Sequence, residues 1–143
     1  SAFRNKNIGV IPQGKSAVGS LTVLENILLP LHLYGEDNVP KAKELMERFH
    51  IEHLEDAMMS ELSGGELRRM AIARALIHDP KVLFADEPTG DLDDENTVTV
   101  LKMLKELAHT GIPVLMVTHE SEAEVYADVL YRMDAGKMER IDA

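Results

Sequence analysis

Two short apolar runs constrain the fold of this chain more than any other feature. KVLFAD (81–86) and IPVLMVTH (112–119) are almost wholly apolar until their polar ends, which is typical of parallel strands buried on both faces. Between them, ENTVTVLKMLKELAHTG (95–111) has apolar residues at helical spacing and closes on Gly111. A strand, a helix and a second strand in this order predict a βαβ unit and a parallel sheet.

The first half of the chain predicts one more strand and three helices. NIGVI (7–11) is the strand, and Pro12 ends it. Two helices open with capping boxes, Thr22 with Glu25 and Ser63 with Glu66, and run to about residue 34 and to about residue 79. Between them, KAKELMERFH forms a helix that starts near a proline, and a short helix (120–128) and a hairpin (129–141) follow the last strand.

These elements divide into three expected segments of an α/β chain. Residues 1–20 hold a strand and a loop, residues 21–79 form a helical subdomain, and residues 80–143 form the rest of the α/β core. On the helix that begins after Ser63, we expect the arginines to serve solubility and ion pairs; they are Arg68, Arg69 and Arg74.

GVIPQGKS (9–16) matches the spelling of a phosphate-binding loop, G-x-x-x-x-G-K-[ST]. Such a loop ends directly in a helix, so that the helix N-terminus faces the phosphates. Here the expected cap, Thr22, lies six residues past Ser16, and Pro12 removes one N–H group from the loop. The sequence therefore predicts a strand and a loop at this place rather than a phosphate cradle.

Polar side chains follow each of the three predicted strands. They are Gln13, then Asp86 and Glu87, then His119. Ligands of open parallel sheets bind at the carboxyl ends of the strands. If the strands are neighbours, an amide, two carboxylates and an imidazole share one crevice, and this set suits a metal-bound triphosphate and an attacking water.

Composition excludes several classes of protein. The net charge is −10, and the chain lacks the basic stripe of a nucleic-acid-binding protein. It has no cysteine, hence no disulfide framework. No apolar run approaches the roughly 20 residues that span a bilayer, and no charged leader precedes an apolar segment.

The motifs VIPQ, LTVLENILLP, LSGGELRRMAIARALIHDPKVLFADEPTGDLD and VLMVTHE occur in this order. The chain resembles, from about Phe3 to Arg140, the nucleotide-binding domain of ABC transporters, with LSGGE as the signature. LTVLENILLP and EPTGDLD are similar to the subfamily of lipoprotein release and of macrolide or peptide export. The resemblance implies a partial P-loop-NTPase-type sheet whose phosphate loop lies upstream of this piece. Pro12 departs from the family, which usually has an aromatic or other apolar residue before the Q-loop glutamine.

The resemblance implies roles for the residues at the strand ends. Asp86 would hold Mg²⁺, directly or through water. Glu87 would orient or deprotonate the attacking water, and His119 would bind the γ-phosphate. Gln13 would touch the metal or the water and report the nucleotide state to the membrane partner.

The signature implies a second nucleotide contact. Ser63, Gly64 and Gly65, with Glu66 in the same turn, would bind the γ-phosphate of an ATP molecule held by a second subunit. The two glycines cost helix stability, which is reasonable if a ligand must approach the backbone. Asp93 would cross to the partner subunit, or it simply begins the next helix.

The implied function is that of an ATP-binding subunit, with ATP and Mg²⁺ as cofactors, that couples ATP hydrolysis to export. Its partners would be transmembrane permease subunits and a second nucleotide-binding domain, at the inner face of the cell membrane. Without a P-loop, we expect this piece to be inactive alone and to self-associate. The alternatives are an ABC ATPase acting on DNA or the ribosome, which the acidic charge and EPTGDLD disfavour, and a non-catalytic docking module, which intact Glu87 and His119 disfavour.

Overall fold

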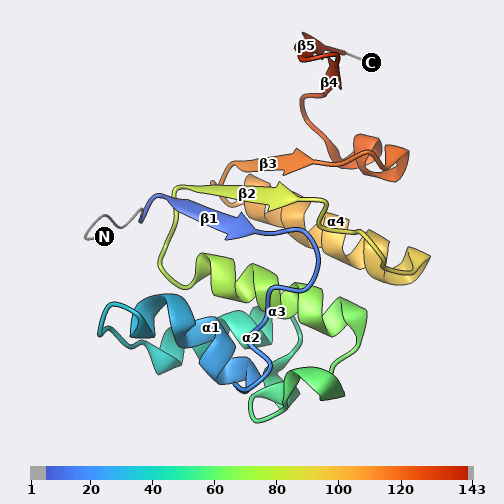
Figure 1. Ribbon diagram of the computed structural model, residues 1–143. Helices are drawn as coiled ribbons and strands as arrows, with labels where there is room; N and C mark the ends of the chain where they lie inside the picture. Colours follow the sequence, from blue (N-terminus) through green and yellow to red (C-terminus); the bar gives the residue numbers. More distant parts are fainter. Residues whose placement is uncertain (1–5, 142–143) are drawn as a thin grey trace.

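The computed structural model describes residues 6–141 and has a parallel sheet lying on a layer of helices (Figure 1). The sheet contains β1 (Ile8–Ile11), β2 (Val82–Asp86) and β3 (Val114–Val117) in the order β1-β2-β3, and both pairings are parallel. The α/β class and the parallel sheet that the sequence predicts are confirmed.

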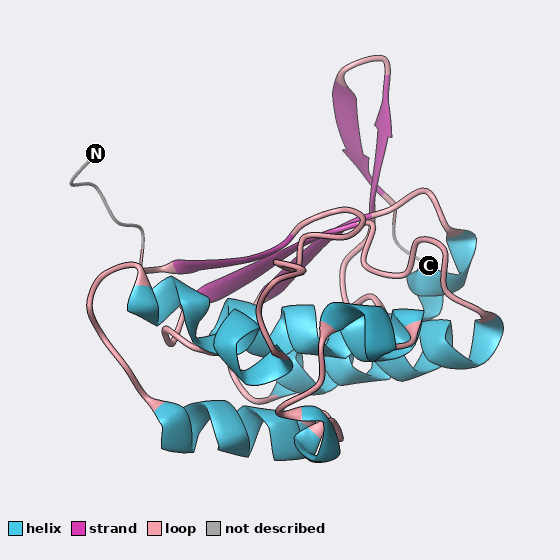
Figure 2. Cartoon of the chain, turned by 60° about the horizontal axis from the view of Figure 1, so that its bottom comes forward, coloured by secondary structure: helices cyan, strands magenta, loops and turns pink. Residues whose placement is uncertain are grey.

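Two of the helices begin where the sequence places their caps, and the helices together form the layer beside the sheet (Figure 2). Thr22 and Glu25 cap α1 (Val23–His32), and Ser63 and Glu66 cap α3 (Gly64–Leu76), each pair as a complete capping box. The other α-helices are α2 (Val39–Arg48) and α4 (Asp94–His109). The short 3₁₀ helices are η1 (Glu52–Leu54), η2 (Met59–Glu61) and η3 (Ser121–Tyr126), so the helix expected over 120–128 is a 3₁₀ segment.

The sheet is buried on one face only. Leu83 and Ala85 of β2 point toward the helices and are fully buried. On the opposite face, Val10, Phe84 and Leu115 form a cross-strand row, in which Val10 is 49% and Leu115 is 58% exposed. The expectation that the strands are buried on both faces is therefore wrong for the described residues, because α1 to α4 all lie on one side of the sheet (Figures 1 and 2).

β1 lies very close to α3. A Cβ atom at Gly9 would stand 2.5 Å from the carbonyl oxygen of Ala75 and 3.0 Å from Cγ of Pro80. Only glycine allows this approach, which brings the strand against the helix that follows the signature. Gly9 therefore has a packing role within the fold.

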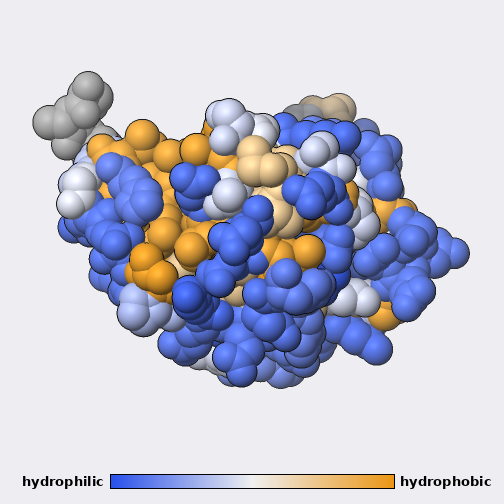
Figure 3. Space-filling model, turned by 90° about the horizontal axis from the view of Figure 1, so that it is seen from below, coloured by the Kyte–Doolittle hydropathy of each residue, from blue (hydrophilic) through white to orange (hydrophobic). Residues whose placement is uncertain are grey.

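Both α1 and α2 contact α3, and a separate helical subdomain over residues 21–79 stays a prediction. α1 buries Val23, Ile27 and Leu31, while Leu33, just past its end, is 72% exposed. Seen from the helical side, the surface combines an apolar area with a wide polar one (Figure 3). None of the helices within residues 6–141 is long and apolar enough to cross a membrane.

The chain ends in the expected hairpin, β4 (Tyr131–Asp134) and β5 (Lys137–Arg140), which projects away from the sheet (Figure 1). Its two-residue turn has positive φ at Ala135 (48°) and Gly136 (78°), as the twist of a tight hairpin requires. All eight strand residues are exposed.

Candidate functional site

The three strand ends that carry polar residues lie side by side. β2 is the middle strand, and its last residue, Asp86, pairs with Val117 at the end of β3. Residues 13, 86–87 and 118–119 thus follow neighbouring parallel strands at one edge of the sheet. The predicted juxtaposition of the strand ends is confirmed.

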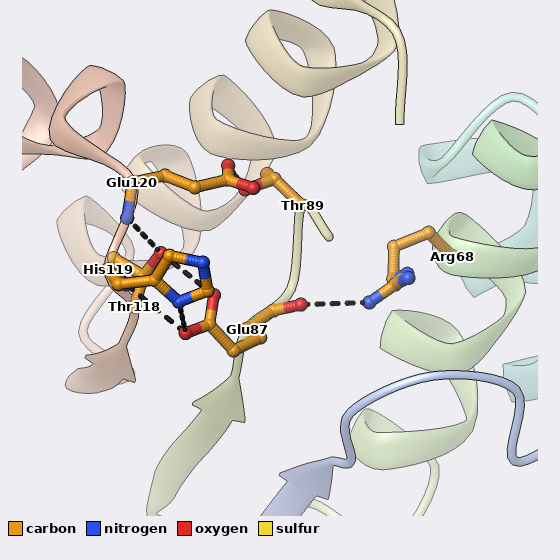
Figure 4. Close-up of polar contacts among 6 residues, drawn as sticks. All are labelled: Arg68, Glu87, Thr89, Thr118, His119 and Glu120. Carbon is orange, nitrogen blue, oxygen red and sulfur yellow. Dashed lines mark hydrogen bonds and ion pairs between the residues drawn. The ribbon is translucent and has the colours of Figure 1, made fainter. Parts of the chain in front are cut away.

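The side chain of Glu87 lies against the end of β3 (Figure 4). Its Oε1 is 2.6 Å from Nδ1 of His119 and accepts the His119 backbone N–H at 3.1 Å. Its Oε2 accepts the hydroxyl of Thr118 at 3.1 Å. The carboxylate is 12% exposed, whereas the histidine ring is 85% exposed. Two of the predicted catalytic residues, Glu87 and His119, are therefore in direct contact.

A sharp turn after β2 aims this carboxylate. The N–H of Glu87 still donates to the Val117 carbonyl, at 2.8 Å, as a continuation of the sheet. The backbone then turns with φ of 47° at Glu87, a conformation that non-glycine residues adopt at a cost and that clusters at functional sites.

The surroundings of Glu87 favour its charged form. Burial raises the pKa of this carboxyl group, but the hydrogen bonds from His119 and Thr118 and the electrostatic attraction of the His119 ring together lower the pKa below its usual value. Glu87 is therefore ionised at neutral pH and acts only as an acceptor, which suits a group that orients or deprotonates a water molecule.

The three arginines of α3 bind backbone carbonyls, so the expectation that they serve solubility and ion pairs is wrong. Arg68 donates to the carbonyls of Glu87 at 3.2 Å and Gly90 at 3.1 Å. Arg69 donates to the Phe49 carbonyl at 3.1 Å, and Arg74 donates to the carbonyl and the hydroxyl of Ser16. The forked guanidinium group suits such multiple acceptors.

Arg68 is a site residue that the sequence analysis missed. Its side chain is buried, with 9% exposure, and this burial lowers its pKa. A signal was present, because Arg68 has helical spacing to Gly65 and Ile72, which are also buried. An arginine in line with a buried stripe indicates a partnered interior cation.

Thr89 and Glu120 were also missed. The hydroxyl of Thr89, which is 1% exposed, donates to Oε2 of Glu120 at 2.7 Å. The N–H of Glu120 in turn donates to the hydroxyl of Thr118 at 3.0 Å. These bonds join the turn after β2 to the segment after β3 (Figure 4). Sequence spacing gave no signal, since the two residues are 31 positions apart.

The signature residues form the first turn of α3. The hydroxyl of Ser63 accepts the N–H of Glu66 at 3.2 Å, and the Glu66 carboxylate accepts the N–H of Ser63 at 2.9 Å. Within the described residues, the N–H groups of Gly64 and Gly65 have no acceptor. These two amides are the donors that the helix N-terminus offers to an anion.

The approach of a ligand is not the only reason for glycine in the first turn of α3, because packing also restricts one of the two positions, Gly65. A Cβ atom at Gly65 would collide with the side chain of Asn96, so the start of α4 occupies the space of a side chain there. A Cβ atom at Gly64 would meet only Cδ2 of Leu92, at an ordinary 3.4 Å. Packing therefore gives a modest reason for glycine at position 65, because only the movable side chain of Asn96 is in the way, and it gives no reason for glycine at position 64.

Asp93 caps α4. Its carboxylate accepts the N–H of Asn96 at 2.8 Å, as an Asp before a helix commonly does. The helix-start role considered for this residue is therefore present in the structure, and a contact with a partner subunit stays a prediction.

Asp86 and Gln13 keep their polar side-chain atoms available. Within residues 6–141, neither side chain makes a hydrogen bond or an ion pair, and Gln13 is exposed. No group of three or more His, Asp or Glu side chains in this range is arranged to hold a metal ion. A carboxylate oxygen and an amide oxygen remain, which are ligand types that Mg²⁺ uses together with phosphates and water.

The segment GVIPQGKS does not lead into a helix. Gly9 to Ile11 belong to β1, and Lys15 is exposed in the following loop. α1 begins only at Val23. The helix N-terminus of a phosphate cradle is therefore missing behind Lys15.

The family model described as "ABC transporter" matches residues 1–90. The chain belongs to the ABC transporter family. Macrolide export ATP-binding/permease protein MacB of Chlorobium luteolum is 40% identical over 95% of this chain and 21% of its own length. Lipoprotein-releasing system ATP-binding protein LolD of Francisella tularensis is 33% identical over 97% of this chain and 62% of its own length.

The fold is that of solved ABC cassettes. The ATP-binding cassette MJ0796, in a dimeric post-hydrolysis state bound to ADP and Pi, superposes with a TM-score of 0.79 at 28% identity, over 96% of this chain and 64% of that one. The chain thus spans less than two thirds of the length of these relatives. Relatives of similar identity carry the names of both export and import systems.

Proposed function

We propose that this chain is the part of an ATP-binding subunit that runs from the Q-loop to the switch histidine and contains the catalytic carboxylate. The observation that carries the proposal is the contact of Glu87 with His119 beside Asp86, at the carboxyl edge of the sheet. A water held by Glu87 at this edge would lie next to the terminal phosphate of Mg·ATP.

Each residue at the edge has a distinct task in this proposal. Asp86 and Gln13 would hold the Mg²⁺ of the nucleotide, because their free carboxylate and amide oxygen atoms are ligands of the kind that this ion uses. The ionised Glu87 orients and deprotonates the water. His119, whose ring is 85% exposed, swings toward the γ-phosphate, and Thr118 and the His119 backbone N–H keep Glu87 at the end of β3.

The signature would serve a second subunit. The free amides of Gly64 and Gly65, beside Ser63, form an anion-binding turn, which Glu66 completes as a cap. The relative solved as a dimer with ADP and Pi supports pairing with a second such domain. In this proposal the two domains pair head to tail, and Asp93 lies at their interface. The residues here bind only one side of the nucleotide, so a phosphate loop from the rest of the parent protein has to complete the site.

The parent protein would couple ATP hydrolysis to transport through transmembrane permease subunits at the inner face of the cell membrane. The name of the MacB relative, an ATP-binding/permease protein, supports this partner class. The direction of export rests on the motifs LTVLENILLP and EPTGDLD, because relatives named for export and for import are about equally similar. The exposed end of α1 at Leu33 offers one surface for such a subunit. A pull-down with the cognate permease separates this role from one on DNA or the ribosome.

A phosphate-release assay tests whether this chain needs a phosphate loop from the rest of the parent protein to hydrolyse ATP. The chain alone, mixed with Mg·ATP, is expected to show no hydrolysis above background. The complete ATP-binding subunit is expected to hydrolyse ATP, and its Glu87→Gln form to bind ATP without turnover. Steady hydrolysis by the chain alone that disappears in Glu87→Gln would contradict the proposal.

A further inference from the structure

The turn that carries Glu87 is held from two sides. On one side, Thr89 is bonded to Glu120 in the segment after β3, at 2.7 Å. On the other side, Arg68 of α3 reaches the same turn with both terminal nitrogens of its guanidinium group. Figure 4 shows the bond to the Glu87 carbonyl. The signature helix is thus joined directly to the backbone of the expected catalytic residue.

Arg68 bridges the two ends of this turn. Its Nη1 donates to the Glu87 carbonyl and its Nη2 to the Gly90 carbonyl. The Glu87 carbonyl also accepts the N–H of Gly90, at 3.2 Å, which closes the turn on itself. Charged donors make the stronger hydrogen bonds of proteins, so the guanidinium group fixes the spacing of two carbonyls three residues apart.

The turn needs such support. Glu87 and Asp91 have φ of 47° and 64°, a conformation that is strained for non-glycine residues and persists only where the surroundings enforce it. Thr89 within the turn is buried, and Glu87 and Gly90, whose carbonyl groups Arg68 binds, are partly buried. The charges of Asp91 and Glu120 favour the cationic form of Arg68 against the effect of burial.

We propose that Arg68 is a positioning residue for Glu87: by bridging the Glu87 and Gly90 carbonyls, it holds the turn in the conformation that directs the Glu87 carboxylate to His119. A movement of the signature helix would then change the aim of the carboxylate within the same chain. The proposal deepens the proposed function, on which it rests for the task of Glu87.

Amide hydrogen exchange, followed by NMR on this chain, tests the proposal without nucleotide. Two amides report on it: the N–H of Gly90, bonded to the Glu87 carbonyl, and the N–H of His119, bonded to the Glu87 carboxylate. In Arg68→Gln, both are expected to exchange about tenfold faster or more, the scale of one hydrogen bond to a charged group. The N–H of Leu83, in the middle of the sheet, is expected to keep its rate.

Arg69→Gln is the matched control. It removes the same group from the next position of α3, where the guanidinium also binds a backbone carbonyl, that of Phe49. It is expected to leave the Gly90 and His119 amides unchanged. Arg68→Lys, which keeps the charge but not the fork, is expected to give rates between those of the native chain and Arg68→Gln.

Two results would overturn the proposal. One is an unchanged exchange rate of the His119 amide in Arg68→Gln, which would show that the aim of Glu87 does not depend on the bridge. The other is equal acceleration by Arg69→Gln, which would reveal a general loss of stability. If Arg68→Gln does not fold, native rates at both amides in Arg68→Lys would overturn it equally. Failure of the proposed function is separate, because it would show as hydrolysis by the parent subunit that is indifferent to Glu87→Gln.

Discussion

The role that the sequence motif suggests for Gly9 differs from the role that this residue has in the structure. As the first letter of GVIPQGKS it suggests a phosphate loop, yet in the fold it lies in β1 against the backbone of α3. The approach of 2.5 Å between its Cβ position and the Ala75 carbonyl leaves no room for a side chain. The absence of a side chain at Gly9 lets β1 pack closely against α3.

Gly9→Ala is therefore expected to destabilise the fold by about 1–3 kcal/mol, since the helix backbone has to move to admit the methyl group. Urea unfolding followed by circular dichroism measures this change. The control is Gly19→Ala, because no atom lies within 4 Å of a Cβ at Gly19; its effect should stay within about 1 kcal/mol. Equal stability of the two variants would show that β1 does not lie this close to α3.

At the residue scale, the sequence predicted interactions that are local. The caps at Thr22 and Ser63 were predictable because each bonds a group three positions away. Arg68 was assigned the wrong role because its acceptors lie 19 and 22 positions further along the chain. Helical spacing indicates an interior position for Arg68, but it does not identify carbonyl groups that only the fold brings near.

At the scale of the elements, the capping box of α1 contains a carboxylate, Glu25, whose ionisation affects the stability of the helix. The N–H of Thr22 donates to the Glu25 carboxylate at 2.9 Å. This bond, and the side-chain bond with Thr22, hold the pKa of Glu25 below its ordinary value of 4.5. Because the folded pKa is the lower one, the charge of Glu25 stabilises the fold fully above the ordinary value, and this contribution is lost as the pH falls through the folded value.

Glu25→Gln tests this dependence, because glutamine can occupy the capping box without a charge. We expect the native chain to have the higher melting temperature at pH 7, and the difference to shrink as the pH is lowered below the ordinary glutamate range. Glu47→Gln removes an exposed carboxylate of α2 that accepts no hydrogen bond in the described structure, and it corrects for the change in net charge. A difference that stays constant with pH would refute the role of the charged cap.

The sequence predicted the strands of the sheet and the meeting of their ends at one edge, but it did not predict which face of the sheet is exposed. Apolar runs with polar ends correctly indicated parallel strands whose ends meet at one edge. Burial on both faces was wrong for the described residues, because it depends on which layers cover the sheet. Leu115, on the uncovered face, is 58% exposed although it lies in an almost wholly apolar run.

For the whole molecule, the uncovered face of the sheet predicts self-association. Besides Val10 and Leu115, it exposes Ile8 by 41% and Val117 by 43%, and contiguous apolar surface of this kind marks an interaction site. We expect light scattering to give a mass that rises above 15.9 kDa with concentration.

Leu115→Thr should lower this mass, because it reduces the apolar surface while keeping a residue that suits a strand. The control, Val125→Thr, changes a valine that is 79% exposed on η3, and should leave the mass as it is. A monomeric mass at all concentrations, or the same effect of both substitutions, would count against the sheet face as the site of association.

The central claim is that this chain carries the signature, the catalytic carboxylate and the switch histidine of an ABC ATPase, but not its phosphate cradle. A calorimetric titration with Mg·ATP, of the chain and of Lys15→Ala, tests this most directly. Lys15 is exposed in a loop without a helix behind it, so neither protein should bind appreciably. Binding in the micromolar range that is lost in Lys15→Ala would show that GVIPQGKS is a working phosphate loop and would contradict this account.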